Sequence, residues 1–157
     1  MGRDVKRVPM DFDWPLHKVW RGYLNPRCEA CADRDCDHCP DHEDSDNYDA
    51  TTAWHETPPP TGDGWQMWEN TSEGSPISPV FSTPELLARW LADTNASAFG
   101  EMGATYDEWL HMITGLGYSV GLVFGRGHPM EPGLVHSYRT RKEADSDAAG
   151  SDDRKAQ

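Results

Sequence analysis

The chain has 157 residues, which fits one domain of ordinary size or a smaller domain with tails. Apolar residues make up 36% of it, and 27 acidic residues against 14 Lys and Arg give a formal net charge of −13. This composition argues against a membrane-spanning protein, which needs a run of ~18 apolar residues. It also argues against direct binding of nucleic acid, which requires an excess of Lys and Arg to neutralise phosphates.

The first expected element is a short helix over residues 14–24. Its apolar residues recur at helical spacing, and Asp13 and Pro15 suit the start of a helix. The apolar stripe comprises Leu16, Val19, Trp20, Tyr23 and Leu24. A helix this short is marginal by itself in water, so we expect the stripe to pack against the rest of the protein.

All four cysteines follow in one short stretch, with the spacing C-x2-C-x4-C-x2-C. Each CxxC turn can direct two thiolates at one ion, and two such turns can close a tetrahedral site. The spacing therefore predicts a structural Zn²⁺ ion held by Cys28, Cys31, Cys36 and Cys39. His38 or His42 could replace one of these ligands. A closed site of this kind has no open position for a catalytic water molecule.

Three other uses of the cysteines stay open. A pair of disulfides is disfavoured, because the first fifteen residues lack the apolar segment of a secretory signal and we expect a reducing, cytoplasmic location. An iron–sulfur cluster is suggested by Cys31-x4-Cys36-x2-Cys39, although the fourth cysteine lies on the wrong side for a plant-type ferredoxin. Redox-active or idle thiols are the third alternative.

The segment around the cysteines is strongly acidic. Residues 28–50 contain nine acidic side chains and a single Arg, a net charge of −8, whereas residues 1–27 carry +3. Four thiolates on one Zn²⁺ would add a formal charge of −2. One interpretation is a solvated loop that keeps the protein soluble. The alternative is a surface that docks a basic protein or imitates DNA phosphates.

The elements after the cysteines alternate between strands and helices. The Pro/Gly-rich stretch TPPPTGDG at 57–64 predicts an extended linker. GWQMWEN at 64–70 predicts a strand. Thr83-Pro84-Glu85 begins a helix over 84–94, and the capping box that starts at Thr105 begins another over 106–114. A strand at 118–124 and a hairpin partner at 134–138 complete the pattern.

These elements predict an α+β fold, with a small Trp-rich antiparallel sheet and two short helices behind an N-terminal helix and a four-cysteine zinc knuckle. We divide the chain into an N-terminal helix and zinc module (1–50), a Pro/Gly-rich linker (51–63), an α+β domain (64–140) and a tail (141–157). The tail has no large apolar residue, so we expect it to be disordered.

Other candidate residues give weaker signals. His111, His128 and His136 with Asp107 could act in acid–base chemistry, but no nucleophile stands beside them in the sequence, so we interpret them as structural or surface residues. GRGH at 125–128 is interpreted as a turn. Trp65 and Trp68 should face opposite sides of their strand, one in the core and the other under the N-terminal helix or exposed to a partner.

The order of these motifs resembles a known family. RDVKRVPMDFDWPLHKVWRGYLNP, the paired CxxC and PPPTGDGWQMWENTSEGSPISPVFSTPELLARWLAD are similar to small zinc-finger-like accessory proteins of actinobacterial tailed phages and prophages. The resemblance spans about residues 3–115 and is most specific over 62–93. Relatives often carry CxxCxGxG repeats like those of DnaJ-type chaperones, whereas this chain lacks those glycines.

The resemblance implies an accessory protein that acts in the host cytoplasm, and it implies no catalytic residue. Together with the cysteine pattern, it leads us to expect a non-enzymatic zinc protein that binds another protein, possibly a basic one. The alternative is an acidic inhibitor or DNA mimic that blocks a host defence or DNA-binding protein.

Overall fold

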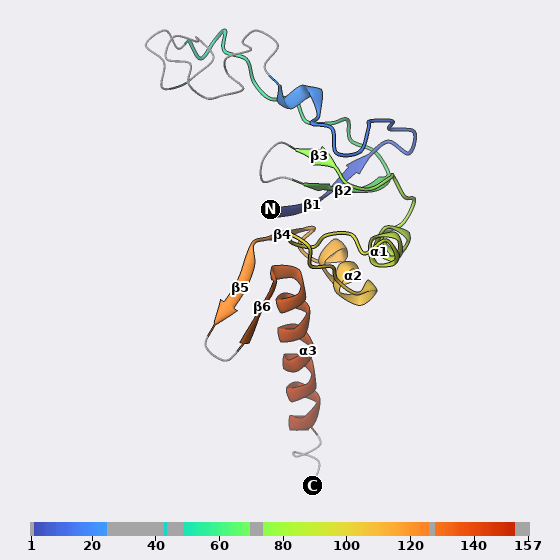
Figure 1. Cartoon of the computed structure of the whole chain (residues 1–157), viewed down its shortest axis with the longest axis vertical. Helices are drawn as coiled ribbons and strands as arrows, with labels where there is room; N and C mark the ends of the chain where they lie inside the picture. Colours follow the sequence, from blue (N-terminus) through green and yellow to red (C-terminus); the bar gives the residue numbers. More distant parts are fainter. Residues whose placement is uncertain (1, 25–42, 44–48, 70–73, 126–127, 153–157) are drawn as a thin grey trace.

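The computed structural model describes residues 2–24, 43, 49–69, 74–125 and 128–152. Its elements, in chain order, are β1 (Gly2–Val8), the 3-10 turn η1 (Arg21–Tyr23), β2 (Gly64–Glu69), β3 (Ser75–Pro76), α1 (Pro84–Asp93), α2 (Tyr106–Thr114), β4 (Tyr118–Val120), β5 (Leu122–Gly125), β6 (His128–Pro132) and α3 (Gly133–Asp152). This is an α+β fold with an antiparallel sheet, as the sequence predicts (Figure 1).

β1 lies inside the four-stranded sheet, whose order is β3-β2-β1-β4. It pairs antiparallel with β2 over six residues, from Arg3↔Glu69 to Val8↔Gly64, and with β4 on its other side. The sequence pattern predicts no strand here, and residues 1–50 are expected to form a separate module. That division needs correction, because residues 2–8 belong to the same sheet as residues 64–69.

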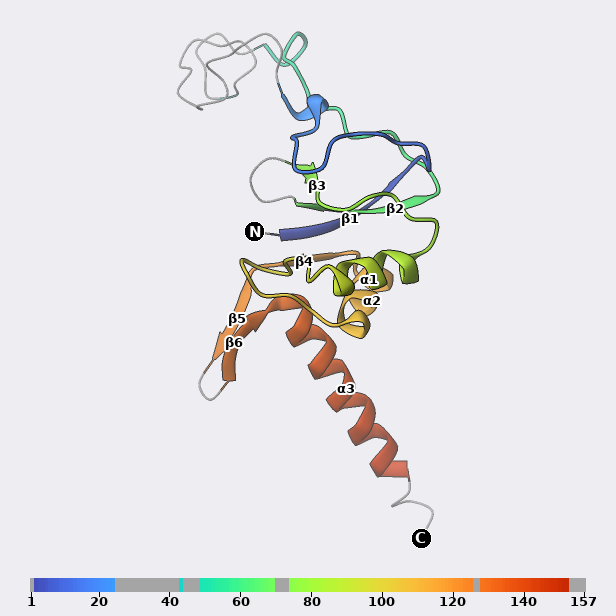
Figure 2. The ribbon, with the colours of Figure 1, turned by 45° about the vertical axis from the view of Figure 1, so that its right-hand side comes forward.

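Side chains alternate between the two faces of the sheet along β1 and β2. Val5 and Met67 face α1 and α2, and Met67 is completely buried there. On the opposite face, Trp68 is completely buried beneath residues 9–24, which cross over it. The sheet is therefore covered on one side by helices and on the other by the N-terminal segment (Figure 2).

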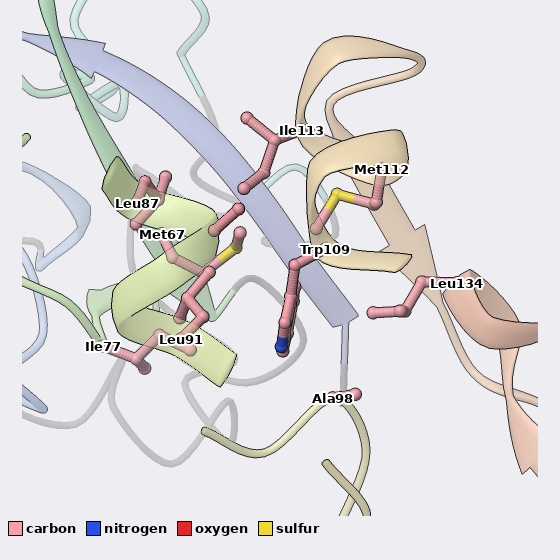
Figure 3. Packing of buried hydrophobic residues seen from close by; sticks show 10 residues of the cluster. Met67, Ile77, Leu87, Leu91, Ala98, Trp109, Met112, Ile113 and Leu134 are labelled. Atoms are coloured by element: carbon pink, nitrogen blue, oxygen red, sulfur yellow. The ribbon is translucent and has the colours of Figure 1, made fainter. Parts of the chain in front are cut away.

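The hydrophobic core lies between the sheet and the helices. Figure 3 shows Leu87 and Leu91 of α1 and Trp109 of α2 converging on Met67. Both helices begin where the sequence predicts. The Thr83 hydroxyl accepts the Leu86 N–H at the start of α1, and the Thr105–Glu108 capping box is complete at the start of α2.

The N-terminal residues are not helical, so the prediction of a helix over 14–24 is wrong. Only the 3-10 turn at 21–23 forms there. Pro15 lacks a backbone N–H, and His17 has φ 60°, outside the helical region. The apolar residues instead lie in an irregular segment with turns, in which Trp20 is buried and Leu16 and Leu24 are exposed.

The C-terminal third also differs from the prediction. Gly121, with φ 68°, divides the expected strand over 118–124 into β4 and β5. The hairpin partner of β5 is β6, whereas residues 134–138 form the start of α3.

The expected disordered tail is helical from residue 141 to residue 152. Two i,i+4 ion pairs support this part of α3, from Arg139 to Glu143 and from Arg141 to Asp145. Residues 141–146 are exposed. The helix therefore extends from the body without burying this section, as Figures 1 and 2 show.

The burial pattern of α3 predicts a sharp contrast between two changes. Leu134 is 1% exposed, so Leu134→Ala should lower the free energy of unfolding by about 2–5 kcal/mol. Truncation after Lys142 removes the exposed section and should change it by less than about 0.5 kcal/mol. Urea denaturation of both variants and the full chain measures this. A large loss on truncation would show that the C-terminal part of α3 packs.

Candidate functional site

The predicted zinc ligands Cys28, Cys31, Cys36 and Cys39 lie outside the described residues, and so do His38 and His42. What the structure does describe is the protein on either side of them, up to Leu24 and again from Asp49. Within the described ranges, no group of three or more His, Cys, Asp or Glu side chains could hold a metal ion. The candidate site is therefore built from the residues that hold the two ends of this cysteine-bearing segment.

Two hydrogen bonds join the chain before the cysteines to the chain after them. Gly22 O accepts the Thr57 N–H at 2.8 Å, and Trp20 Nε1 donates to Thr57 O at 2.8 Å. Both backbone groups of Thr57 are thus bonded to residues 20–22. We call these contacts the clamp, and the chain between them, residues 23–56, the cysteine loop.

The clamp requires a glycine at position 22. A Cβ atom there would overlap the carbonyl oxygen of Thr57 and would lie 2.5 Å from Trp20 Nε1. Any larger residue at position 22 would therefore push the two chain segments of the clamp apart. The backbone of the two ends can approach this closely only because Gly22 has no side chain.

The clamp is fixed to the sheet through its edge strand. Trp20 N donates to Gly74 O at 3.0 Å, and His17 N donates to Pro76 O at 2.8 Å, so residues 17–20 bond to β3 and to the residue that precedes it. The ring of Tyr23 lies directly against Gly74, where a Cβ would overlap it. These contacts orient both ends of the cysteine loop relative to the core.

An aromatic cluster fills the space between the clamp and the sheet. The Trp20 ring, 7% exposed, lies 5.5 Å from Phe12 and 4.9 Å from Trp14, centroid to centroid. Phe12 in turn lies 6.3 Å from Trp68. Aromatic contacts of this kind bury large areas and prefer such tilted arrangements. The outer face of the sheet is consequently closed by its own N-terminal segment.

Trp65 and Trp68 of β2 lie on opposite faces of the sheet, as the sequence predicts. Trp68 is completely buried, which confirms that one of the pair is in the core, and its Nε1 donates to Gln66 Oε1 at 3.0 Å. An irregular segment with turns, rather than a helix, covers it. Trp65 is half-buried on the helix side, with the Arg7 guanidinium 4.0 Å from its ring. Both tryptophan rings of β2 therefore pack against other side chains of the same chain.

Basic side chains surround the aromatic cluster. Lys6, Lys18 and Arg21 lie 5.4–5.6 Å from the rings of Trp68, Trp14 and Trp20, respectively. Burial acts to lower the pKa of Lys6, but the hydrogen bond and charge of Asp4, together with Tyr23, outweigh it and raise that pKa. The positive charges of Lys6, Lys18 and Arg21 therefore lie close to the start of the acidic cysteine loop.

The candidate acid–base residues do not form one cluster. His111 Nε2 lies 3.5 Å from Ser137 Oγ, and the His111 ring contacts Tyr138. His136 instead contacts Glu131 Oε1 at 2.9 Å. Asp107 is exposed in the first turn of α2. The side chain of His128 and most of the GRGH turn lie outside what the structure describes.

Glu131 is the centre of a separate ionic cluster that joins β6 to α3. It is largely buried, and Arg139 binds both of its carboxylate oxygens, at 2.6 and 3.1 Å, while His136 binds one of them. Paired contacts of this type satisfy a buried carboxylate. The contact between His136 and Glu131 therefore has a structural role, because it links β6 to α3.

A prediction for the clamp follows from the contact at Gly22. Gly22→Ala should accelerate hydrogen exchange at the Thr57 amide and increase proteolysis of residues 23–56, because the new Cβ overlaps the Thr57 carbonyl oxygen. Leu24→Ala, at an exposed position nearby, is the matched control and should leave both unchanged. Equal behaviour of the two variants would contradict the clamp.

The comparisons with known proteins add no relative. Searches against protein-family models, curated proteins and solved structures gave no match to this chain. Among the described helices, none has the length and apolar character required to cross a membrane.

Proposed function

We propose that this protein is a non-enzymatic zinc-binding protein that acts by binding another protein through its cysteine loop. The observation that carries the proposal is the clamp, in which Trp20 and Gly22 bond both backbone groups of Thr57. A fold that fixes both ends of a loop limits how far apart those ends can move. The resemblance to phage accessory proteins suggests the host cytoplasm as its setting.

The cysteine spacing supports Zn²⁺ as the ion that organises the loop. Two CxxC turns separated by four residues can supply four thiolates to one tetrahedral ion, with Cys28, Cys31, Cys36 and Cys39 as ligands. The bound ion would be structural. Zinc binding contributes on the order of 10–16 kcal/mol in small finger peptides, which is enough to order a loop that has little apolar content.

The covered outer face of the sheet is an argument for the cysteine loop, rather than the tryptophans of β2, as the surface that binds a partner. Trp68 is completely buried under Phe12 and Trp20, and Trp65 is covered by Arg7. A partner would have to displace the N-terminal segment to reach them. Figures 1 and 2 place η1 and residues 49–56 at the end of the molecule opposite α3.

The charge of the loop favours a basic partner. Residues 28–50 carry −8 from side chains, and four thiolates on Zn²⁺ would add −2. Electrostatic attraction of this size accelerates association and helps to select partners, and it weakens as salt screens it. The basic side chains Lys6, Lys18 and Arg21 lie over tryptophan rings beside the clamp and can limit how far the acidic surface extends.

A second candidate function is inhibition by imitation of DNA. It is favoured by the net charge of −13 and by the concentration of acids in one segment of the chain. In that case the partner would be a DNA-binding protein of the host. Competition separates the two candidates, because a DNA mimic should be displaced by duplex DNA and a docking protein should not.

The zinc prediction is tested on the full chain. Purified protein should contain one Zn²⁺ per chain, and Cys31→Ser should lose it, whereas Ser45→Ala in the same segment should retain it. A strong chelator should then increase hydrogen exchange within residues 23–56 while β1, β2, α1 and α2 stay protected, because the core that those elements share is built from described residues outside 23–56. Metal-free protein with unchanged exchange would contradict the proposal.

The partner prediction is tested by affinity capture from host extract with the tagged full chain. We expect a protein that binds the native chain, is lost with Cys31→Ser, and elutes at rising salt as charges are screened. A variant with Asp33, Asp35, Asp37 and Asp41 changed to Asn keeps the cysteines and should bind more weakly. Equal capture by native and Cys31→Ser protein would contradict a role for the zinc-organised loop.

A further inference from the structure

A groove lies at the other end of the molecule, between α2, β4 and the first turns of α3. Its cavity has a volume of about 680 Å³, within the range of small-molecule sites. The floor and one side are apolar and comprise Met112 of α2, Val123 of β5 and Leu134 of α3. Figure 3 shows Leu134 pointing toward Trp109, so the groove lies directly over the core.

The rim of the groove leaves two large side chains open to water. Leu116 is 75% exposed and Tyr118 is 50% exposed, and both line the cavity. Leu116 follows the end of α2, and Tyr118 begins β4, so the fold displays both side by side at the mouth of an apolar cavity. Adjacent exposed apolar groups around a cavity are typical of a binding site.

Polar groups gather at one end of the same groove. His111 Nε2 and Ser137 Oγ are 3.5 Å apart, at the outer limit of a hydrogen bond, so neither group is strongly engaged by the other. Arg141, one turn after Ser137 on α3, lines the cavity beside them. Arg141 and His111 also line a second cavity of about 470 Å³ that continues past Lys142.

The local charge at this end is positive, in contrast to the chain as a whole. Arg141 and Lys142 contribute two positive charges, and Asp145 contributes one negative charge to the lining. The Arg141–Asp145 pair is 3.6 Å apart, and both side chains are about 70% exposed, so the pair is weak and Arg141 can turn to a ligand. Lys142 lies 5.8 Å from the Tyr138 ring.

We propose that this groove binds a small amphipathic carboxylate. The apolar body of the ligand lies against Met112, Val123 and Leu134, and its carboxylate accepts hydrogen bonds from Arg141 and Ser137 at the polar end. Arg presents a fork of donors that matches a carboxylate. The site uses no residue of the cysteine loop or the clamp, so this inference is independent of the proposed function.

The test uses the full chain and decanoate as the probe, with decan-1-ol as a neutral ligand of similar apolar body. Decanoate should bind saturably at one site per chain, below its micelle-forming concentration, in isothermal titration calorimetry. Amide shifts in the NMR spectrum should change at the end of α2, in β4 and in the first half of α3. Decan-1-ol should bind about tenfold more weakly, because it lacks the charge.

Two variants locate the site, and a third is the control. Arg141→Gln should weaken decanoate about tenfold and leave decan-1-ol unchanged, and Ser137→Trp should block both ligands by filling the groove. Arg89→Gln removes a cation of α1 that lies over Tyr106, away from the groove, and should have no effect. Circular dichroism confirms that each variant is folded.

Three outcomes would overturn the proposal. The first is absence of saturable binding of decanoate. The second is equal binding of decanoate and decan-1-ol with no effect of Arg141→Gln, which would show an apolar pocket without carboxylate recognition. The third is a ligand-independent dimer in size-exclusion chromatography that Leu116→Ser dissociates, which would show that a second copy of the chain covers the groove.

Discussion

The structure depends on the pairing of β1 in the interior of its sheet. Residues 2–8 bond to β2 on one side and to β4 on the other, so a strand from the start of the chain joins two strands that are separated in sequence by residues 70–117. The chain must then return across the outer face of the sheet, and Phe12 and Trp20 cover Trp68 as it does so. This return path places the clamp beside β3, at the edge of the sheet that residues 17–20 cover.

The sequence allowed α1 and α2 to be predicted, but neither β1 nor α3. Thr83 and Thr105 are local signals, since each cap contacts residues within the next turn. β1 contains Arg3, which reads as a surface residue, yet it is buried because Ser97 accepts two hydrogen bonds from its guanidinium and Glu69 lies 3.7 Å away. Burial acts to lower the pKa of Arg3 and Glu69 partly opposes this. Partners so distant in sequence leave no local pattern.

The same distinction explains what could be predicted of the two sites. The cysteine spacing is a local signal, so candidate metal ligands could be named without a structure. The clamp could not, because Trp20 and Gly22 meet Thr57 from a distant part of the sequence, and such a pairing leaves no local pattern. The groove also has no sequence signature. Residues 134–141 were expected to be a strand and a disordered tail, and only their helical form brings Ser137 to His111 and Arg141 to the mouth of the cavity.

The clamp also affects how far binding of Zn²⁺ in the cysteine loop would contribute to the stability of the rest of the fold. Closing a loop of the length of residues 23–56 costs about 3 kcal/mol in chain entropy. The two hydrogen bonds to Thr57 and the burial of Trp20 are of the right size to offset this cost without a metal ion. Binding of Zn²⁺ inside the loop would then order a segment whose ends are already fixed. Loss of Zn²⁺ would leave the clamp, the sheet and the groove in place, because the contacts described for them are made by residues other than 28–39, which hold the predicted ligands.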